Sequence, residues 1–148
     1  MDPKQERFVA IPVVLGICIA AVVGTATVLY QTTIANPTIG EYFSLFTVGR
    51  LLALTHVHMF GYATMGYLLW TIGRRQGVTR TNVFGVILGL AVIAGILDVL
   101  SWWGVVYLNP AFRFLTFVAG GAFVAGILLS ALLVLLAFMR GGSGNQSR

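Results

Sequence analysis

Apolar residues fill four long stretches of the chain, and polar residues are concentrated in the short intervals between them. Each stretch has roughly 20 residues or more, which is the length that an α-helix needs to cross the hydrocarbon core of a bilayer. The stretches cover approximately residues 8–30, 50–72, 81–107 and 112–138. The pattern predicts an all-α integral membrane protein, a four-helix bundle formed by one domain over residues 1–140. The Gly- and Ser-rich residues 141–148 are predicted to be a flexible tail.

Composition supports this class of protein. The chain is 58% hydrophobic and only 9% charged, whereas a soluble domain carries roughly 25% charged residues. The net charge of +5 does not indicate nucleic-acid binding, because the basic residues are scattered at the ends of the apolar stretches. The single cysteine, Cys18, lies in the first stretch and has no second cysteine with which to form a disulfide or a thiolate metal site.

The positions of the basic residues predict the orientation in the membrane. One group of intervals holds most of them: Lys4 and Arg7 before the first stretch, Arg74, Arg75 and Arg80 between the second and third, and Arg140 and Arg148 after the fourth. Cytoplasmic loops carry an excess of Lys and Arg. Both termini are therefore expected in the cytoplasm, and the interval 31–49 is expected outside. That interval contains a turn signal at 36–40 and an aromatic segment at 41–46, which is expected to lie along the membrane surface.

Small residues recur at four-residue spacing in three of the predicted helices. The first carries Gly16, Ala20 and Gly24, and similar stripes occur around 85–95 and 120–126. Small faces allow helices to approach closely in lipid. Two uses remain open: packing within one bundle, or contact with a second copy or a partner subunit.

The two histidines of the chain, His56 and His58, both fall inside the second apolar stretch. Ionisable side chains at membrane depth are costly and usually mark a functional site. At 1.5 Å per residue, the pair lies roughly 9–12 Å from the outer end of its helix, and Asp98 lies roughly 13 Å from the outer end of the third. Arg50, Arg113 and Glu41 also belong to the outer side, so the ionisable groups inside the bundle are expected to gather in its outer half.

Residues two apart on a helix point about 200° away from each other. His56 and His58 therefore cannot bind one metal ion from a regular helix, and one of them should face the bundle interior. His58 shares its face with Thr55, Tyr62 and Met65, and His56 shares its face with Met59 and Phe60. If one histidine binds haem iron, then Met59, Met65 or the histidine of a second copy are candidates for the other axial position.

Other interpretations of these residues remain open. The histidines, Asp98, Tyr62 and Glu41 can form a polar network between helices without any cofactor. A copper or zinc site that uses both histidines with Glu41 or Asp98 suits the ligand types, although the divergence of the histidines counts against it. Trp102, Trp103 and Tyr107 are most simply an aromatic belt at the outer interface.

The segment 53–66, Ala-Leu-Thr-His-Val-His-Met-Phe-Gly-Tyr-Ala-Thr-Met-Gly, resembles the His-x-His stretch of short bacterial membrane proteins related to subunit I of haem–copper terminal oxidases. The resemblance implies a bacterial inner-membrane location and a role for His56 or His58 as a haem b ligand. It covers about twenty residues and otherwise only the number of spans. Because no other histidine is present, an oxygen-reducing centre with a second haem and copper cannot be built from this chain, and an enzymatic activity is not assigned.

Two functions follow as hypotheses. In the first, the protein is a b-type haem protein that transfers electrons, with quinol as a donor, or binds a diatomic gas; Arg50 and Arg113 would then pair with the haem propionates. In the second, it is a non-catalytic accessory subunit of a larger respiratory complex. The partners are membrane lipid and either a second copy or that complex, and nucleic acid is not expected.

Overall fold

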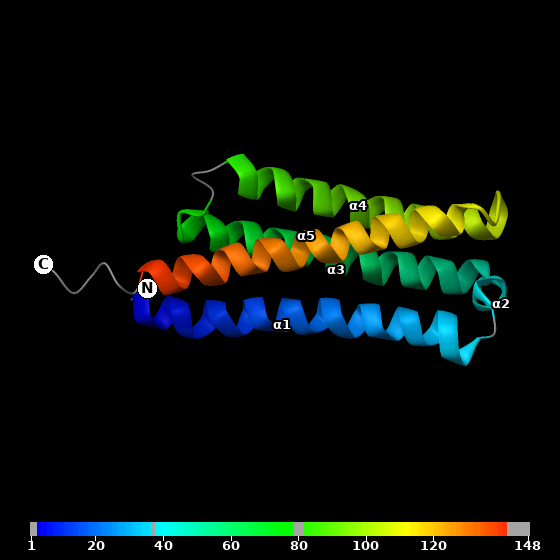
Figure 1. Ribbon diagram of the computed structural model, residues 1–148, viewed down its shortest axis with the longest axis horizontal. Helices are drawn as coiled ribbons and strands as arrows, with labels where there is room; N and C mark the ends of the chain where they lie inside the picture. Colours follow the sequence, from blue (N-terminus) through cyan, green and yellow to red (C-terminus); the bar gives the residue numbers. More distant parts are fainter. Residues whose placement is uncertain (1–2, 37, 79–81, 142–148) are drawn as a thin grey trace, which may run out of the picture.

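The computed structural model describes residues 3–36, 38–78 and 82–141, and the described residues form helices joined by short connections (Figure 1). The long helices are α1 (Pro3–Tyr30), α3 (Val48–Arg75), α4 (Asn82–Tyr107) and α5 (Phe112–Gly141). The short helix α2 (Ile39–Ser44) lies between α1 and α3. The described part of the chain is therefore all-α, as the apolar pattern predicts.

The four long helices lie side by side and alternate in direction, so that the start of α1 and the end of α5 lie at one end of the bundle and α2 lies at the other (Figure 1). Among these pairs, α4 and α5 make the most extensive contacts, α1 packs mainly on α5, and α3 packs mainly on α4. The connection Leu108–Ala111 is tight, because the Asn109 side chain accepts a hydrogen bond from the Ala111 backbone N–H at 2.8 Å.

At the opposite turn, α1 continues into a π-helical turn, Gln31–Ala35, before the chain becomes extended at Asn36. The Thr38 hydroxyl then caps α2 by accepting from the Glu41 backbone N–H, and the Thr47 hydroxyl caps α3 by accepting from the Arg50 N–H. Threonine side chains satisfy backbone donors that a helix start leaves unpaired. Polar residues of the connection between α1 and α3 thus set where α2 and α3 begin.

The core runs through the middle of the bundle and is built from aliphatic, small and aromatic side chains. Val14 of α1, Leu69 of α3, Phe84 of α4 and Ile127 of α5 are fully buried in it. Glycine permits the closest helix contacts: a Cβ at Gly126 would lie 2.6 Å from the Ala91 Cβ, so α4 and α5 are in contact through small residues.

Three of the described helical segments are long and apolar enough to cross a membrane: Gln5–Ala35, Asn82–Tyr107 and Phe112–Arg140. The protein is therefore a multi-pass membrane protein by the length and composition of its helices. Helix α3 has 28 residues, which is also long enough, but it carries polar side chains on both its buried and its exposed faces and is less apolar than the other three.

Some helix ends differ from the predicted stretches. Helix α1 begins at Pro3, α3 ends at Arg75 and α5 ends at Gly141, so each helix extends beyond its apolar part at the end where the termini lie. The length of an apolar stretch indicates how much of a helix can lie within a bilayer. The backbone hydrogen bonds of the helix continue beyond that stretch into the flanking polar residues. Arg80, Thr81, the Pro37 position of the predicted turn and the predicted tail from residue 142 lie outside the described residues.

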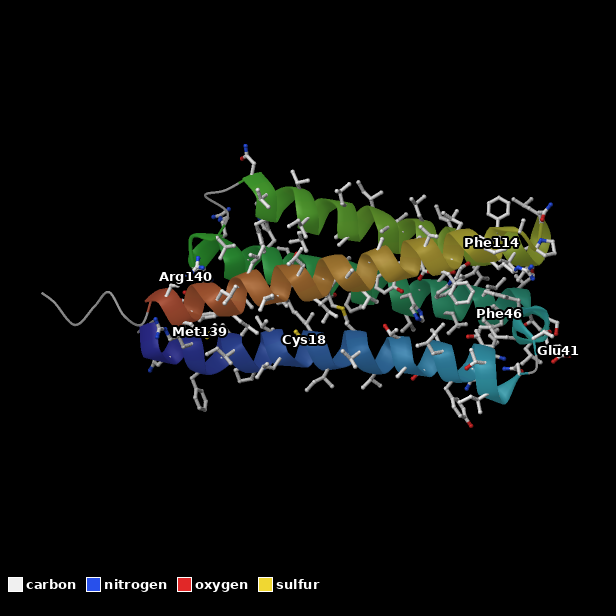
Figure 2. The ribbon with its side chains drawn as sticks, viewed as in Figure 1. Cys18, Glu41, Phe46, Phe114, Met139 and Arg140 are labelled. Atoms are coloured by element: carbon white, nitrogen blue, oxygen red, sulfur yellow. The ribbon has the colours of Figure 1, made fainter. Side chains whose placement is uncertain are left out.

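The arginines Arg7, Arg74, Arg75 and Arg140 belong to the end of the bundle where the termini lie, as follows from the alternating helix directions. Figure 2 shows Arg140 and Met139 at this end and Glu41, Phe46 and Phe114 at the other, with Cys18 between them on α1. The Gln76 amide donates to the Glu6 carboxylate at 3.5 Å and links α1 to the end of α3. The charge asymmetry that the sequence predicts is therefore present in three dimensions.

The small residues of α4 and α5 differ from those of α1 in what they contact. On α4 and α5 some members are used inside the bundle, because Gly95 and Gly126 lie against neighbouring side chains, whereas Gly89 and Gly121 are exposed and a Cβ there would have no neighbour within 4 Å. On α1, Gly16, Ala20 and Gly24 are exposed, and a Cβ at either glycine would have no neighbour within 4 Å. Close packing within one chain thus accounts for some of the small residues on α4 and α5 and not for the stripe of α1.

Candidate functional site

Asp98 of α4 is the centre of a hydrogen-bonded cluster in the half of the bundle nearer to α2. Its side chain is only 5% exposed. The Tyr62 hydroxyl, from α3, donates to Asp98 Oδ2 at 3.1 Å, and the Trp102 indole N–H donates to Asp98 Oδ1 at 3.2 Å. A buried carboxyl group is costly unless its oxygens are satisfied, and here each oxygen accepts from a different aromatic side chain.

His58 lies beside this cluster on the buried side of α3. Its Nδ1 is 2.8 Å from the Leu54 carbonyl oxygen, one helical turn earlier. Because a carbonyl oxygen only accepts, Nδ1 carries the hydrogen and Nε2 keeps its lone pair when the ring is neutral. The ring makes edge-to-face contacts with Trp102 at 4.8 Å and Tyr62 at 5.7 Å between centroids. His58 is therefore held in one orientation by its backbone bond and two aromatic neighbours.

His56 lies on the opposite side of the same helix and is exposed. The structure thus separates the two histidines as the 200° spacing predicts: His58 faces the interior with Tyr62 and Met65, and His56 faces outward with Phe60. Met59, which the sequence places near His56, is 37% exposed.

Tyr62 is positioned by close packing. Its ring lies 3.9 Å from that of Phe123 of α5, between centroids. A Cβ at Gly95 would lie 2.7 Å from the Tyr62 ring and 2.9 Å from the Phe123 ring. Because Gly95 has no side chain, the Tyr62 ring has room to lie against α4 and reach Asp98.

Two further hydrogen bonds tie the helices together at this level. The Ser101 hydroxyl donates to the Asp98 backbone carbonyl at 2.6 Å and lies 2.6 Å from the Thr116 hydroxyl of α5. The Trp103 indole N–H donates to the Thr55 hydroxyl of α3 at 2.9 Å. The network consequently joins α3, α4 and α5.

Trp102 and Trp103 were expected in an aromatic belt, and their hydrogen bonds to Asp98 and Thr55 were not anticipated from the sequence. The bond of Trp102 could have been predicted, because Trp102 follows Asp98 by four residues, which places both side chains on one face of a helix. The partner of Trp103 is 48 positions away in sequence and carries no such local signal.

The other predicted site residues lie at the end of the bundle that carries α2. Arg50 and Arg113 are exposed at the starts of α3 and α5, and their guanidinium carbons lie 5.2 Å from the rings of Phe46 and Phe114, respectively. Glu41 is exposed in the first turn of α2. Asp98 is therefore satisfied by aromatic donors, whereas the arginines of this end lie over aromatic rings.

Among the described residues, no group of three or more His, Cys, Asp or Glu is placed to hold a metal ion. The copper or zinc hypothesis needs both histidines with Glu41 or Asp98. The structure puts His56 and His58 on opposite faces and Glu41 on the separate helix α2.

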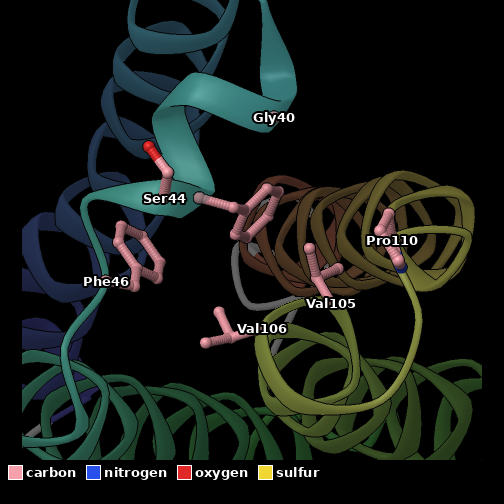
Figure 3. Close-up of a pocket in the computed structure, with 7 residues that line it drawn as sticks. Gly40, Ser44, Phe46, Val105, Val106 and Pro110 are labelled. Carbon is pink, nitrogen blue, oxygen red and sulfur yellow. The ribbon is translucent and has the colours of Figure 1, made fainter.

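An apolar pocket of about 220 Å³ opens at the α2 end of the bundle, between α2, the end of α4 and the turn before α5 (Figure 3). Its lining comprises Gly40, Phe43, Ser44, Phe46, Val105, Val106 and Pro110. Next to it, burial raises the pKa of the Tyr42 phenol, and the Arg50 charge opposes part of that rise. The pocket does not include His58 or Asp98 in its lining and forms a separate feature of the bundle.

Comparison of the chain with protein-family models, with curated proteins and with solved structures found no match. The function of the site must therefore be argued from its own geometry.

Proposed function

We propose that the protein is a four-span protein of the bacterial inner membrane with both termini in the cytoplasm. The fourth span is α3, whose 28 residues correspond to about 42 Å of helix and which lies alongside the three apolar helices (Figure 1). The polar side chains on its buried face have partners: the Thr55 hydroxyl and the Tyr62 hydroxyl are hydrogen-bonded to α4. The arginine-rich end then faces the cytoplasm under the positive-inside rule.

Within this bundle, His58 is proposed to bind a b-type haem used for electron transfer or for binding a diatomic gas. The observation that carries the proposal is the hydrogen bond from His58 Nδ1 to the Leu54 carbonyl at 2.8 Å. Histidines that bind metals commonly donate their other ring N–H to a carbonyl or carboxylate, which sets the tautomer and raises the basicity of the ligating nitrogen. The Nε2 of His58 has the protonation state that a haem ligand requires.

The chemistry of the described residues around His58 gives a bare metal ion no second ligand, and it supports a haem in which the porphyrin supplies the other nitrogen ligands. Aromatic side chains flank the imidazole, and the carboxyl of Asp98 is already satisfied by Tyr62 and Trp102. A haem would supply one-electron redox chemistry or an open iron position at this depth. Arg50 and Arg113, at the outer end, have the side-chain chemistry to pair with propionate groups.

The methionines of α3 would not join His58 in holding a haem. Met59 is adjacent to His58 in the helix and points to another face, and Met65 is seven residues on, about 10 Å along the same helix. A ligand opposite His58 must come from another helix or another chain. The function that follows is either gas binding at an open position or electron transfer with a ligand from a partner.

The test is the dithionite-reduced minus oxidised spectrum of the full-length protein, purified in mild detergent after expression with added haem precursor. We expect a sharp alpha band of b-type haem, with the pyridine haemochrome giving one haem per chain or per pair of chains. A flat spectrum from folded, helical protein would overturn the haem proposal.

A second candidate is an accessory subunit of a larger respiratory complex, in which the cluster serves packing alone. The observation in its favour is that both oxygens of Asp98 are satisfied within the chain, so the network is complete without a cofactor. Co-purification with redox subunits, together with a colourless isolated chain, would support this function in place of haem binding.

A further inference from the structure

The inward side of α1 is covered along most of the helix and uncovered at one place. Val14, Ala21 and Val28 follow one another at seven-residue spacing, which is close to two full turns, so all three point to the same side. Val14 and Ala21 are buried in the core, whereas Val28 is 42% exposed. Thr32, about one turn further on, is buried again. The bundle therefore leaves an opening along α1 between Ala21 and Thr32, which we call the α1 opening.

Helix α5, on which α1 mainly packs, shows the same change of burial. Phe138, Ala131, Val124 and Phe117 lie close to one line along this helix; the first two are buried, Val124 is partly buried and Phe117 is 38% exposed. The start of α1 and the end of α5 lie at one end of the bundle (Figure 1). Val28 and Phe117 are about 37 Å and 36 Å from that end at 1.5 Å per residue, so they lie at the same level.

Helix α3 brings His58 to this level. His58 is ten residues, about 15 Å, from the start of α3, and Val28 is about 10 Å before the end of the π-helical turn, so their levels differ by about one helical turn. Trp102 and Tyr62 cover the His58 ring on the α4 side, and the part of the half-buried ring that stays exposed points away from α4. Gly61, one turn from His58, adds room, because a Cβ there would meet no atom within 4 Å.

The residues around the α1 opening favour one kind of ligand. Arg113 lies about one turn before Phe117, and Arg50 lies about three turns before Gly61, so both arginines are on the sides of α5 and α3 that border the opening, toward α2. Haem combines an apolar macrocycle, an iron that takes an imidazole nitrogen and two carboxylates that suit arginine. A phospholipid offers an anionic group to the arginines, but it would leave the His58 nitrogen unused.

We propose that the haem of His58 lies in the α1 opening, between α1, α3 and α5, with Val28 and Phe117 against its macrocycle and its carboxylates toward Arg50 and Arg113. The inference rests on the haem binding proposed above and adds the surface that receives the haem. It gives α1 a part in the site, although this helix carries no side chain that could bind iron through nitrogen within the opening.

The test is to fill the opening from α1 and to measure haem per chain with the pyridine haemochrome assay. Val28→Trp should lower the haem content about tenfold or more, because the indole takes the space of the macrocycle. Val23→Trp is the matched control: Val23 points about 140° away from Val28, is 58% exposed and should keep the wild-type haem content. Equal haem in the two variants would overturn the proposal and leave haem binding by His58 intact. A wild-type chain without haem would overturn both.

A second pair of variants decides the question if Val28→Trp fails to fold. Gly61→Leu adds a side chain where a Cβ meets no atom within 4 Å, so resistance to unfolding by SDS should be unchanged or higher through helix propensity, while the haem content falls. Gly49→Leu, on the same helix and also without a neighbour within 4 Å, should keep the haem. Wild-type haem content in Gly61→Leu, with unaltered helix content by circular dichroism, would show that the α1 opening is covered by lipid alone.

Discussion

The Tyr62 hydroxyl donates a hydrogen bond to Asp98 Oδ2 at 3.1 Å and joins two helices across 36 positions of sequence. With the Trp102 indole on Oδ1 at 3.2 Å, it satisfies both oxygens of a carboxyl group that is 5% exposed. This arrangement accounts for an acidic residue in the middle of an apolar helix, and it makes the cluster sensitive to the loss of any one member.

The first prediction concerns Asp98. Asp98→Ala leaves the Tyr62 and Trp102 donors buried without an acceptor and should lower the free energy of unfolding by about 2–4 kcal/mol. Asp98→Asn should cost only about 1 kcal/mol, because the amide oxygen accepts from the indole and the amide N–H₂ donates to the rotatable hydroxyl. Unfolding by SDS in mixed micelles measures both values. Equal loss in the two variants would show that the negative charge, and not the hydrogen bonding, stabilises the bundle.

The second prediction concerns the glycine beneath Tyr62. Gly95→Ala puts a methyl group 2.7 Å from the Tyr62 ring and 2.9 Å from the Phe123 ring, and the overpacking should cost about 1–3 kcal/mol. Gly89→Ala, on the same helix, meets no atom within 4 Å and should be neutral or stabilising by about 0.5–1 kcal/mol through helix propensity. The same unfolding assay compares them, and a Gly95→Ala variant as stable as Gly89→Ala would contradict the close contact of α4 with these rings.

The third prediction compares two fully buried serines. The Ser101 hydroxyl bonds to the Asp98 carbonyl and to Thr116, so Ser101→Ala should destabilise by about 1 kcal/mol through the loss of these bonds, while the Thr116 hydroxyl keeps the Phe112 carbonyl as an acceptor. Among the described residues, the Ser130 hydroxyl is buried with no hydrogen-bond partner. Ser130→Ala should therefore be neutral or stabilising, since it removes an unsatisfied polar group. A large loss of thermal stability in Ser130→Ala would reveal a bond that the present geometry does not contain.

The fourth prediction identifies the haem ligand. His58→Ala should abolish the reduced alpha band, because the proposed iron-binding Nε2 is removed. His56→Ala is the matched control two residues away on the opposite face, and it should retain haem at the wild-type stoichiometry. Haem content per chain from the pyridine haemochrome assay decides between them. If His56→Ala alone loses haem, the haem ligand is His56 on the exposed face of α3 and not His58.

Sequence patterns alone determined the helical class, the approximate extent of the apolar helices, and the separation of the two histidines onto opposite faces. Each of these follows from a local quantity: the length of an apolar run, or the 100° rotation per residue. The similar depth of Asp98 and the histidines also follows, because depth is a count of residues along each helix. The closeness of Tyr62 to Asp98 could be predicted in the same way, from the depth of each residue along its helix.

Only the tertiary structure decided which side chains meet. His58 faces the interior because the side of α3 that carries Leu51, Tyr62 and Leu69 packs inward. Helical periodicity gives the angle between two side chains, but it does not tell which of them points toward the interior. The bond of Trp103 to Thr55, the space at Gly95 and the placement of the arginines over aromatic rings depend on helix rotation and on contacts between distant segments. The polar residues Thr55 and Tyr62 of α3 find their partners on the neighbouring helix α4, and no local pattern describes these contacts.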